Sequence, residues 1–330
     1  MKKFVINLVL TLICSAAVVR AATVEVDVSP CNLDGWTPSA TGSSSLNFVN
    51  GPATPPCGTG SAEFRIDSTG ASNATLANVN YNNTMLSDLT ALSYNTFVSS
   101  APSSGGQAVF IALSLDLDGN GSVDDTIYFE PRLQGTTVTL NTWQSWNALT
   151  GLWWSQNSIA GATQAAPKSL ADYLAAHPNA RIVNLSTGVG GVQLIAGNGG
   201  AGDWGNFVGN ADCFTIGVSG GDTTTFDFEL DADNDGVPDN IDQCCDSDLR
   251  PKVDVNGTDP GVTSINNTVN AQGCSIQDLV NQCANGVKNH GQYVSCIAHL
   301  ANNLAKAKTI TKAQATEMKT GAAQSSIGKK

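Results

Sequence analysis

The chain has 330 residues, of which 13% are charged, and it carries a formal net charge of −12. This length predicts two or more structural units, because one core usually serves about 100 to 200 residues. Such an acidic chain is not expected to bind nucleic acid, which depends on clustered Lys and Arg. Residues 222–259 alone hold 12 acidic and 2 basic residues, which would repel one another unless cations neutralise them.

The N-terminus, residues 1–21, has the layout of a secretory signal peptide. Lys2 and Lys3 precede an apolar run over residues 4–19, and the small residue Ala21 follows. The run is short for a bilayer span, so we expect no membrane span in the mature protein. We predict cleavage after Ala21 and a secreted protein, extracellular or periplasmic, in which the cysteines form disulfides.

Residues 22–230 show the pattern of a β-sandwich, so the expected fold class is mainly β. Val24, Val26 and Val28 alternate with acidic residues, which is typical of a strand with one buried face. Short apolar runs separated by Gly, Asn and Ser predict further strands. These runs are residues 62–66, 109–117, 126–129, 136–140, 181–185, 191–195, 213–218 and 224–230. One helix is predicted after Ser169, a residue type that caps helices.

The pattern changes after Leu230. Residues 231–262 are acidic and lack an apolar run long enough for a helix or strand, which predicts an irregular linker. Residues 263–330 predict a small α-helical domain, since apolar residues recur there at spacings of three and four. The residues in this pattern are Ile276, Leu279, Val280, Val294, Ile297, Leu300 and Leu304. Ser275 and Thr311 are predicted to cap two of the helices.

An aspartate loop opens the predicted linker. Carboxylates stand at positions 1, 3, 5, 9 and 12 of this run, and Gly236 stands at position 6, where a sharp turn is needed. Ca²⁺ takes six to eight oxygen ligands, which a chain wrapped around the ion supplies at such spacings. The predicted calcium ligands are Asp231, Asp233, Asp235, Asp239 and Asp242, with Val237 contributing its backbone carbonyl. A flexible acidic linker without metal is the alternative.

The run Asp-x-Asp-x-Asp-Gly-x-x-Asp-x-x-Asp-x-Cys, which ends at Cys244, resembles the thrombospondin type-3 repeat. The resemblance covers residues 231–248. It implies calcium wrapped by irregular backbone and a cysteine that staples the segment to its neighbours. The adjacent Cys244 and Cys245 and the lack of a full second repeat depart from the family pattern. A tandem array of calcium sites is therefore not expected.

A second acidic run lies between two predicted strands. Asp116, Asp118, Asn120 and Asp124 place oxygens at positions 1, 3, 5 and 9. The Asn120-Gly121 pair is also typical of a tight hairpin turn. The run is therefore either a plain hairpin or a second calcium site, and the two interpretations are compatible.

The tryptophans fall in the β region, and four of them lie close together in the sequence. These four are Trp143, Trp146, Trp153 and Trp154. Exposed aromatic rings on a secreted β-sandwich can stack on sugar rings, so the four are candidates for glycan contact. Trp is also a normal core residue with one polar edge. Core packing is the expected role for most of them, and glycan contact stays the alternative.

Cysteine pairing is expected to staple the domains. The disulfide candidates are Cys31, Cys57, Cys244, Cys245, Cys274, Cys283 and Cys296. We expect Cys31 to pair with Cys57 at the start of the β domain. One of the two adjacent cysteines is expected to reach Cys274, and Cys213, on a predicted strand, is expected to be unpaired.

The helical region also contains a Cys-x6-His-x5-Cys-x2-His set. Cys283, His290, Cys296 and His299 offer the ligand types of a tetrahedral zinc site. A disulfide between Cys283 and Cys296 that joins two helices is the simpler interpretation in an exported protein.

Four segments together resemble secreted bacterial proteins with thrombospondin type-3 repeats. They are Gly-Gly-Gln at residues 105–107, the Trp-rich residues 143–154, Tyr-Leu-Ala-Ala-His-Pro at 173–178 and Asn-Phe-Val-Gly-Asn at 206–210. This resemblance spans most of the mature chain. It implies a jelly-roll-like fold for residues 22–230, as in carbohydrate-binding modules.

The sequence favours a non-catalytic function. No recognisable nucleophile motif accompanies His177, His290 or His299. We expect a calcium-binding protein in which Ca²⁺ stiffens an interdomain linker, with a role in extracellular binding or adhesion to a glycan or a surface protein. The alternatives are a carbohydrate-binding accessory module that uses the Trp-rich domain, and a surface component whose basic helical tail docks a partner.

Overall fold

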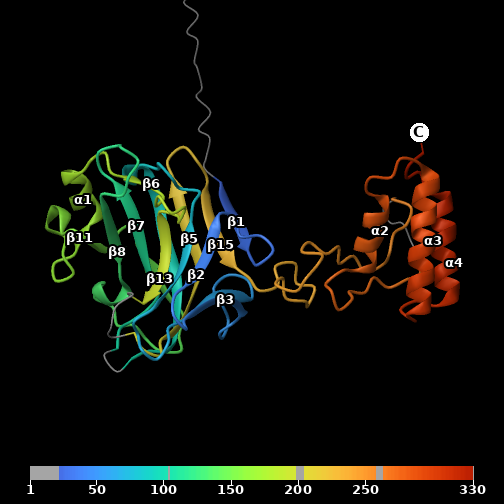
Figure 1. The fold of residues 1–330 in the computed structure, drawn as a ribbon, viewed down its shortest axis with the longest axis horizontal. Coiled ribbons are helices and arrows are strands. Elements are labelled where there is room, and N and C mark those ends of the chain that lie inside the picture. The colour runs from blue at the N-terminus through green and yellow to red at the C-terminus, as the bar shows by residue number, and fades with distance from the viewer. Residues whose placement is uncertain (1–21, 103–104, 198–203, 258–262, 330) are drawn as a thin grey trace, which may run out of the picture.

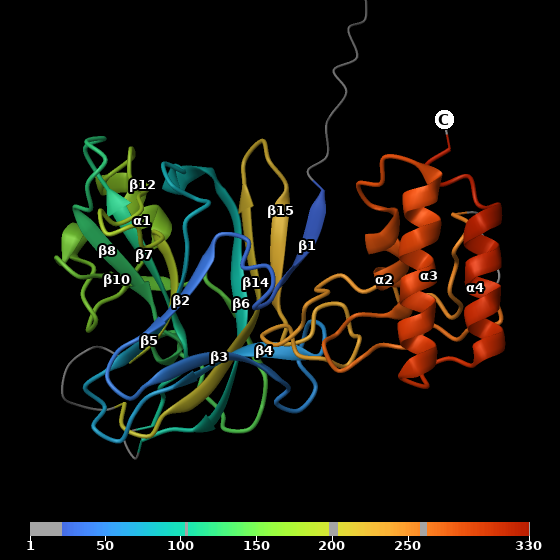
Figure 2. The same cartoon turned by 45° about the vertical axis from the view of Figure 1, so that its right-hand side comes forward.

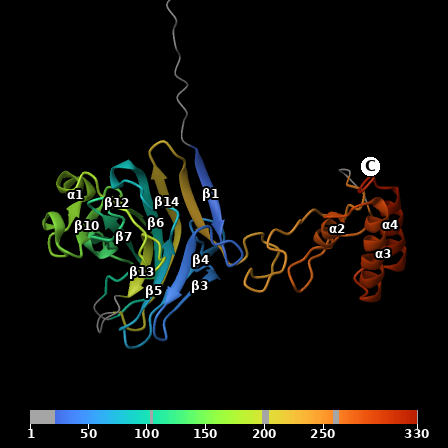
Figure 3. The same cartoon turned by 45° about the horizontal axis from the view of Figure 1, so that its top comes forward.

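A computed structural model describes residues 22–102, 105–197, 204–257 and 263–329. The predicted signal peptide, residues 1–21, lies outside the described residues. A β domain stands at one end of the molecule and a helical domain at the other, and an irregular segment joins them (Figures 1 and 3). The prediction of a mainly β fold with C-terminal helices is confirmed.

Two sheets form the β domain. In the seven-stranded sheet the order is β1 (Thr23–Val28), β15 (Thr223–Phe228), β14 (Val208–Val218), β4 (Gly60–Arg65) and β3 (Ser45–Asn50). The long strand β6 (Leu89–Ser100) also pairs with β14 and carries β9 (Gln144–Asn147) on its other side. β1 runs parallel to β15, so the two ends of the domain's chain lie on neighbouring strands.

The eight-stranded sheet faces the first one (Figure 2). Its order is β11 (Lys168–Ser169), β10 (Leu152–Ser155), β8 (Asp125–Phe129), β7 (Phe110–Asp116), β13 (Val192–Gly197), β5 (Asn73–Asn78) and β2 (Trp36–Ala40), with β12 (Arg181–Ile182) on β7. Short 3-10 helices lie at Leu86–Asp88, Pro131–Leu133 and Ile159–Gly161. Helix α1 (Leu170–Ala176) begins at Ser169, whose hydroxyl accepts from the Asp172 N–H as predicted.

The core of the β domain lies between the two sheets. Trp36 on β2 meets Phe214, Phe226 and Phe228 of the opposite sheet edge-on, with ring centroids 5.3 to 5.4 Å apart. All four side chains are at most 2% exposed. Edge-to-face aromatic pairs contribute about 0.5–1.5 kcal/mol beyond their buried area, so this group is a main clamp between the sheets.

The helical domain contains α2 (Ile276–Ala284), α3 (His290–Lys306) and α4 (Lys312–Gln324). α3 and α4 lie side by side (Figure 2). Ser275 and Thr311 cap α2 and α4 with full capping boxes, as predicted. Val253 and Val255, which precede the helices, belong to the same apolar core. No helix within the described ranges is long and apolar enough to cross a membrane.

One predicted strand is absent. Residues 136–140 form no strand, apart from a single bridge between Leu140 and Val98. The side chain of Gln144 takes the hydrogen bonds that a neighbouring strand would have made. Its amide oxygen accepts from the Thr139 N–H, and its amide nitrogen donates to the Thr137 carbonyl.

The disulfides differ in part from the prediction. The expected Cys31–Cys57 pair is wrong, since Cys57 pairs with Cys213 and Cys31 pairs with Cys245. Cys213 is therefore not unpaired. The reason is topological: the loop that carries Cys57 lies across β14, next to Cys213, and this contact between residues 156 positions apart leaves no trace in a local pattern.

Two further disulfides agree with the prediction. Cys244 reaches Cys274, and Cys283 pairs with Cys296 between α2 and α3. The second bond removes both thiols from the alternative zinc set. Four disulfides within the described residues indicate an oxidising environment.

Candidate metal centre

The aspartate loop, residues 231–242, follows directly on the last β-strand. Its backbone forms no helix or strand. Asn234 and Gly236 adopt positive φ angles of 58° and 92°, which bend the chain back on itself. Both residue types tolerate this left-handed region, so the sharp turn predicted at position 6 is confirmed.

The loop brings all five predicted aspartates together. Asp231, Asp233 and Asp239 each offer an oxygen within 4.8 Å of the others. Asp233, Asp235 and Asp242 form a second group with the same spacing. Asp233 belongs to both groups, so the five carboxylates form two adjoining three-oxygen sites. The predicted contribution of the Val237 carbonyl stays a prediction.

Backbone N–H groups aim these carboxylates. Asp231 accepts from the Gly236 N–H at 2.9 Å, and Asp235 accepts from the Val237 N–H at 2.7 Å. Asp233 accepts from the Ser247 N–H at 2.6 Å, which ties the loop to the chain that follows it. These backbone donors therefore orient three of the five carboxylates.

Two carboxylate oxygens in the loop lack a partner. The Oδ2 atoms of Asp239 and Asp242 are buried and make no hydrogen bond among the described residues. Asp239 as a whole is 4% exposed. A buried oxygen without a donor costs free energy unless something else satisfies it, and a cation does so. Both atoms belong to the acidic groups described above.

Burial also affects the charge state of the loop. Desolvation raises the pKa of Asp231, Asp235 and Asp239 above the usual value, and the neighbouring carboxylate of Asp233 adds to the effect. No Lys or Arg side chain forms a salt bridge with these carboxylates in the described part of the chain, because the salt bridges there involve other residues. The site therefore favours an added positive charge.

Two disulfides attach the chain just after the aspartate loop to both domains. Cys245 bonds to Cys31 of the β domain, whereas its neighbour Cys244 bonds to Cys274 at the start of the helical domain. The departure from the repeat pattern thus has a structural use. The two adjacent cysteines attach the segment to two different domains.

Sequence reasoning missed two residues that support the loop. The Ser247 hydroxyl lies 3.2 Å from Asp235 Oδ2 and 3.0 Å from Asp278 Oδ2. Asp278 also accepts from the Asp248 N–H at 2.9 Å. Asp278 was predicted only as part of a helix cap. No local signal in the sequence shows that its carboxylate also accepts hydrogen bonds from Ser247 and Asp248 of the linker.

The second acidic run forms a hairpin loop between β7 and β8, as predicted. Asp116, Asp118 and Asp124 each offer an oxygen within 4.8 Å of the others. Burial acts to raise the pKa of Asp116, but three backbone N–H groups and Arg181 outweigh it and lower the pKa. Calcium binding there stays a prediction, since the loop already satisfies Asp116 without a metal.

The four candidate tryptophans do not share one surface. Trp146 and Trp153 are 5% and 1% exposed, so they pack in the core, the role expected for most of the four, and the alternative of glycan contact does not hold for them. Trp143 is half-buried, packs on Phe97 and donates to the Pro52 carbonyl. Trp154, half-buried like Trp143, lies on the outer face of the eight-stranded sheet.

Trp154 stands in an aromatic row with Tyr128 and Phe110. Trp154 stacks on Tyr128 with centroids 4.4 Å apart, and Tyr128 meets Phe110 at 6.1 Å. The Trp154 indole N–H donates to Glu130 Oε1 at 2.7 Å, and Gln164 donates to the same oxygen. The row thus combines flat apolar rings with an amide and a carboxylate.

Comparison with known proteins gives few similarities. No protein-family model matches the chain. No curated protein is similar to it in sequence. Among solved structures, a β-1,2-glucanase from Parabacteroides distasonis is 12% identical over 56% of this chain and 23% of its own, with a TM-score of 0.31. The chain thus spans about a quarter of that enzyme.

Two carbohydrate-binding modules from Clostridium thermocellum are similar to the β domain in the same way. The C-terminal family 22 module is 14% identical over 57% of this chain and 89% of its own, with a TM-score of 0.26. The family 11 module is 9% identical over 57% and 90%, with a TM-score of 0.27. At these values the similarities carry no argument about the ligand of this chain.

Proposed function

We propose that this protein is a secreted, non-catalytic calcium-binding protein in which Ca²⁺ fixes the segment between two domains. The observation that carries the proposal is the convergence of five aspartates into two three-oxygen groups that share Asp233. The buried, unpartnered oxygens of Asp239 and Asp242 support it. Calcium suits the site because it accepts six to eight oxygens in flexible geometry.

The ion and the disulfides act on the same segment in different ways. Cys31–Cys245 and Cys244–Cys274 limit how far the loop can move from each domain. Calcium would neutralise the carboxylates and hold them in one arrangement. The consequence is a defined spacing between the β domain and the helical domain, which suits a protein that binds or adheres to an extracellular glycan or surface protein.

Local proteolysis tests this proposal. Leu249 follows the loop, is 46% exposed and offers a cleavage site for chymotrypsin. Calcium at about 100 times its Kd stabilises the bound state by about 2.7 kcal/mol, so cleavage after Leu249 should be slow with calcium and fast with EDTA. In Asp233→Ala/Asp235→Ala the rate should be fast in both conditions.

Asp246→Ala is the matched control, because Asp246 is an exposed aspartate of the same segment outside both acidic groups. This variant should keep the full calcium response. Equal cleavage of the wild-type chain in millimolar calcium and in EDTA would contradict the proposal.

A second function, glycan binding by the β domain, rests on the aromatic row. Trp154 and Tyr128 are both partly exposed, and the exposed Gln164, held by the buried Glu130, lies beside them. Rings that stack on a sugar and polar groups that bind its hydroxyls are the usual parts of such a site. A soluble glycan array with the full chain should give binding that Trp154→Ala abolishes and Trp143→Ala, away from the row, preserves. An array without any bound glycan would contradict this second function.

A further inference from the structure

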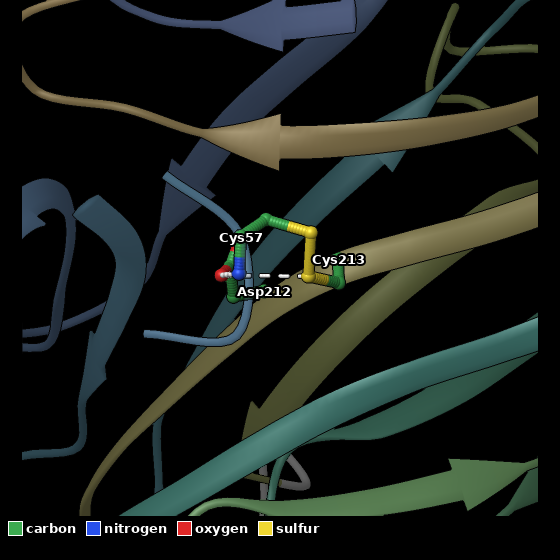
Figure 4. Close-up of side chains that lie close together, drawn as sticks. All are labelled: Cys57, Asp212 and Cys213. Atoms are coloured by element: carbon green, nitrogen blue, oxygen red, sulfur yellow. Dashed lines mark hydrogen bonds between the residues drawn. A yellow bond between two sulfur atoms is a disulfide. The ribbon is translucent and has the colours of Figure 1, made fainter. Parts of the chain in front are cut away.

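Three acidic side chains are buried on the outer face of the seven-stranded sheet. Two of them lie just before the aspartate loop in the chain, but none belongs to its two acidic groups. Asp212 on β14, Asp227 on β15 and Glu229 just after it are 0%, 3% and 4% exposed. The loop over residues 51–59 covers them and is pinned by the Cys57–Cys213 disulfide, beside which Asp212 lies (Figure 4). We call this group the covered acid cluster.

Hydrogen bonds satisfy two of the three carboxylates. Asp212 accepts from the N–H groups of Cys57 and Phe228, each at 3.2 Å. Glu229 accepts from both the N–H and the hydroxyl of Thr59. The covering loop is therefore built to hold these carboxylates in place.

Asp227 is different. Its Oδ1 atom is buried and has no hydrogen-bond partner among the described residues. No salt bridge within the described ranges reaches any member of the covered acid cluster. A charged carboxylate that is 97% buried, with neither a donor nor a cation beside it, costs free energy. A bound cation would remove this cost.

The glycines of the covering loop let the backbone approach the carboxylates closely. A β-carbon added to Gly58 would lie 2.5 Å from Asp227 Oδ2 and closer still to Glu229 Oε1. The two oxygens therefore approach the same point. A β-carbon at Gly60 would lie 2.7 Å from Glu229 Oε2. A β-carbon at either position would overlap these oxygens, so the loop can close over the two carboxylates only with glycine there.

The surroundings add negative charge. Asp27 of β1 lies opposite Asp227 in the parallel register, and Glu25 lies two residues before it on the same strand. Desolvation, followed by the charges of Asp212 and Glu229 and then those of Asp27 and Glu25, raises the pKa of Asp227 to about 8. Desolvation raises the pKa of Asp212 to about 7. Either protons or a cation must neutralise the cluster near neutral pH.

We propose that the covered acid cluster binds a hard divalent cation through Asp227 and Glu229. The sulfurs of Cys57 and Cys213 are bonded to each other and supply no thiolate, so the available donors are oxygens. Oxygen donors select calcium or magnesium over softer metals. The ion would hold β15 and the covering loop together, next to the point where the chain leaves the β domain.

Metal counting in a prepared background tests this site separately from the aspartate loop. The full chain would carry Asp233→Asn and Asp235→Asn, which take the shared carboxylate out of both acidic groups of the loop and a second one out of the group with Asp242. Equilibrium dialysis against calcium or magnesium, followed by elemental analysis, gives the ions bound per chain. Adding Asp227→Asn should lower this number by one, and Glu229→Gln should do the same. Asp88→Asn, at a half-buried aspartate of the same domain outside the covered acid cluster, should not change it.

Thermal unfolding provides the second readout. In the prepared background, calcium or magnesium should raise the midpoint, and Asp227→Asn should remove this rise. Asn keeps the shape of a protonated Asp, so the variant is expected to fold, and its near-UV circular dichroism checks this. If protons alone neutralise the cluster, Asp227→Asn leaves both the ion count and the response to either metal unchanged. That result overturns the proposal and leaves the calcium function of the aspartate loop untouched.

Discussion

Different interactions stabilise the β domain and the aspartate loop. The β domain buries Trp36, Phe214 and many other apolar side chains between two sheets. The aspartate loop has no such core, and its exposed Ile241 is 62% accessible. Its order comes from carboxylates, backbone N–H groups and two disulfides. The domain depends on hydrophobic burial, whereas the loop depends on covalent bonds and, we propose, on calcium.

This difference predicts which conditions affect which region. Apolar burial does not depend on metal, so chelation should leave the sandwich core unchanged. The loop should respond to chelation and to reduction, because each removes one of its two supports. The loss of stability caused by a mutation in the β domain should therefore be the same in calcium and in EDTA, whereas the loss caused by a mutation in the loop should differ between the two conditions.

The largest expected loss comes from the core. Trp36→Ala removes a ring that touches three phenylalanines of the opposite sheet and should lower the free energy of unfolding by about 3–5 kcal/mol. Urea denaturation followed by fluorescence measures it. The loss should be the same in calcium and in EDTA. A loss that depends strongly on calcium would break the proposed division between the two regions.

The next largest loss of stability is expected from removing the disulfide Cys244–Cys274 beside the aspartate loop. Cys244 and Cys274 are 30 positions apart, and closing a loop of that length contributes about 3–4 kcal/mol in the chain-entropy description. Cys244→Ser/Cys274→Ser should lower the stability of the helical end by this amount. The loss should be greater in EDTA, since calcium then no longer supports the same segment.

Cys283→Ser/Cys296→Ser, which removes another disulfide, is the matched control for the Cys244–Cys274 variant. These residues are 13 positions apart and join two helices that share an apolar core, away from the aspartate loop. The loss should be somewhat smaller and equal with and without calcium. Proteolysis after Leu249 measures both variants. An identical calcium dependence for the two would contradict a role of Cys244–Cys274 in the linker.

Local patterns predicted the fold class, the order of the domains and many of the elements, although not the long strand β6. The alternation of Val24, Val26 and Val28 correctly predicted β1, and the Ser275 cap correctly predicted the start of α2. These features depend on neighbours a few residues away, and the periodicity of the chain records them. The aspartate spacing likewise predicted which carboxylates converge, because a single tight loop brings them together.

Contacts between distant segments could not be predicted in this way. The partner of Cys31 lies 214 positions away, and the covered acid cluster joins β14 and β15 with a loop more than 150 positions earlier. Trp153 and Trp154 look equivalent in sequence. They point to opposite faces of β10, so one is buried in the core and the other is half-exposed.

The smallest expected effect concerns the contact between linker and helix. Asp278→Ala removes a helix cap and also the acceptor for Ser247 and Asp248, so it should cost about 1–3 kcal/mol and speed proteolysis after Leu249. Asp172→Ala in α1 is the matched control, because Asp172 bonds only to its own cap residue Ser169. It should cost less and leave cleavage after Leu249 unchanged. Equal cleavage rates in the two variants would mean that Asp278 acts only as a helix cap and that the aspartate loop is held without it.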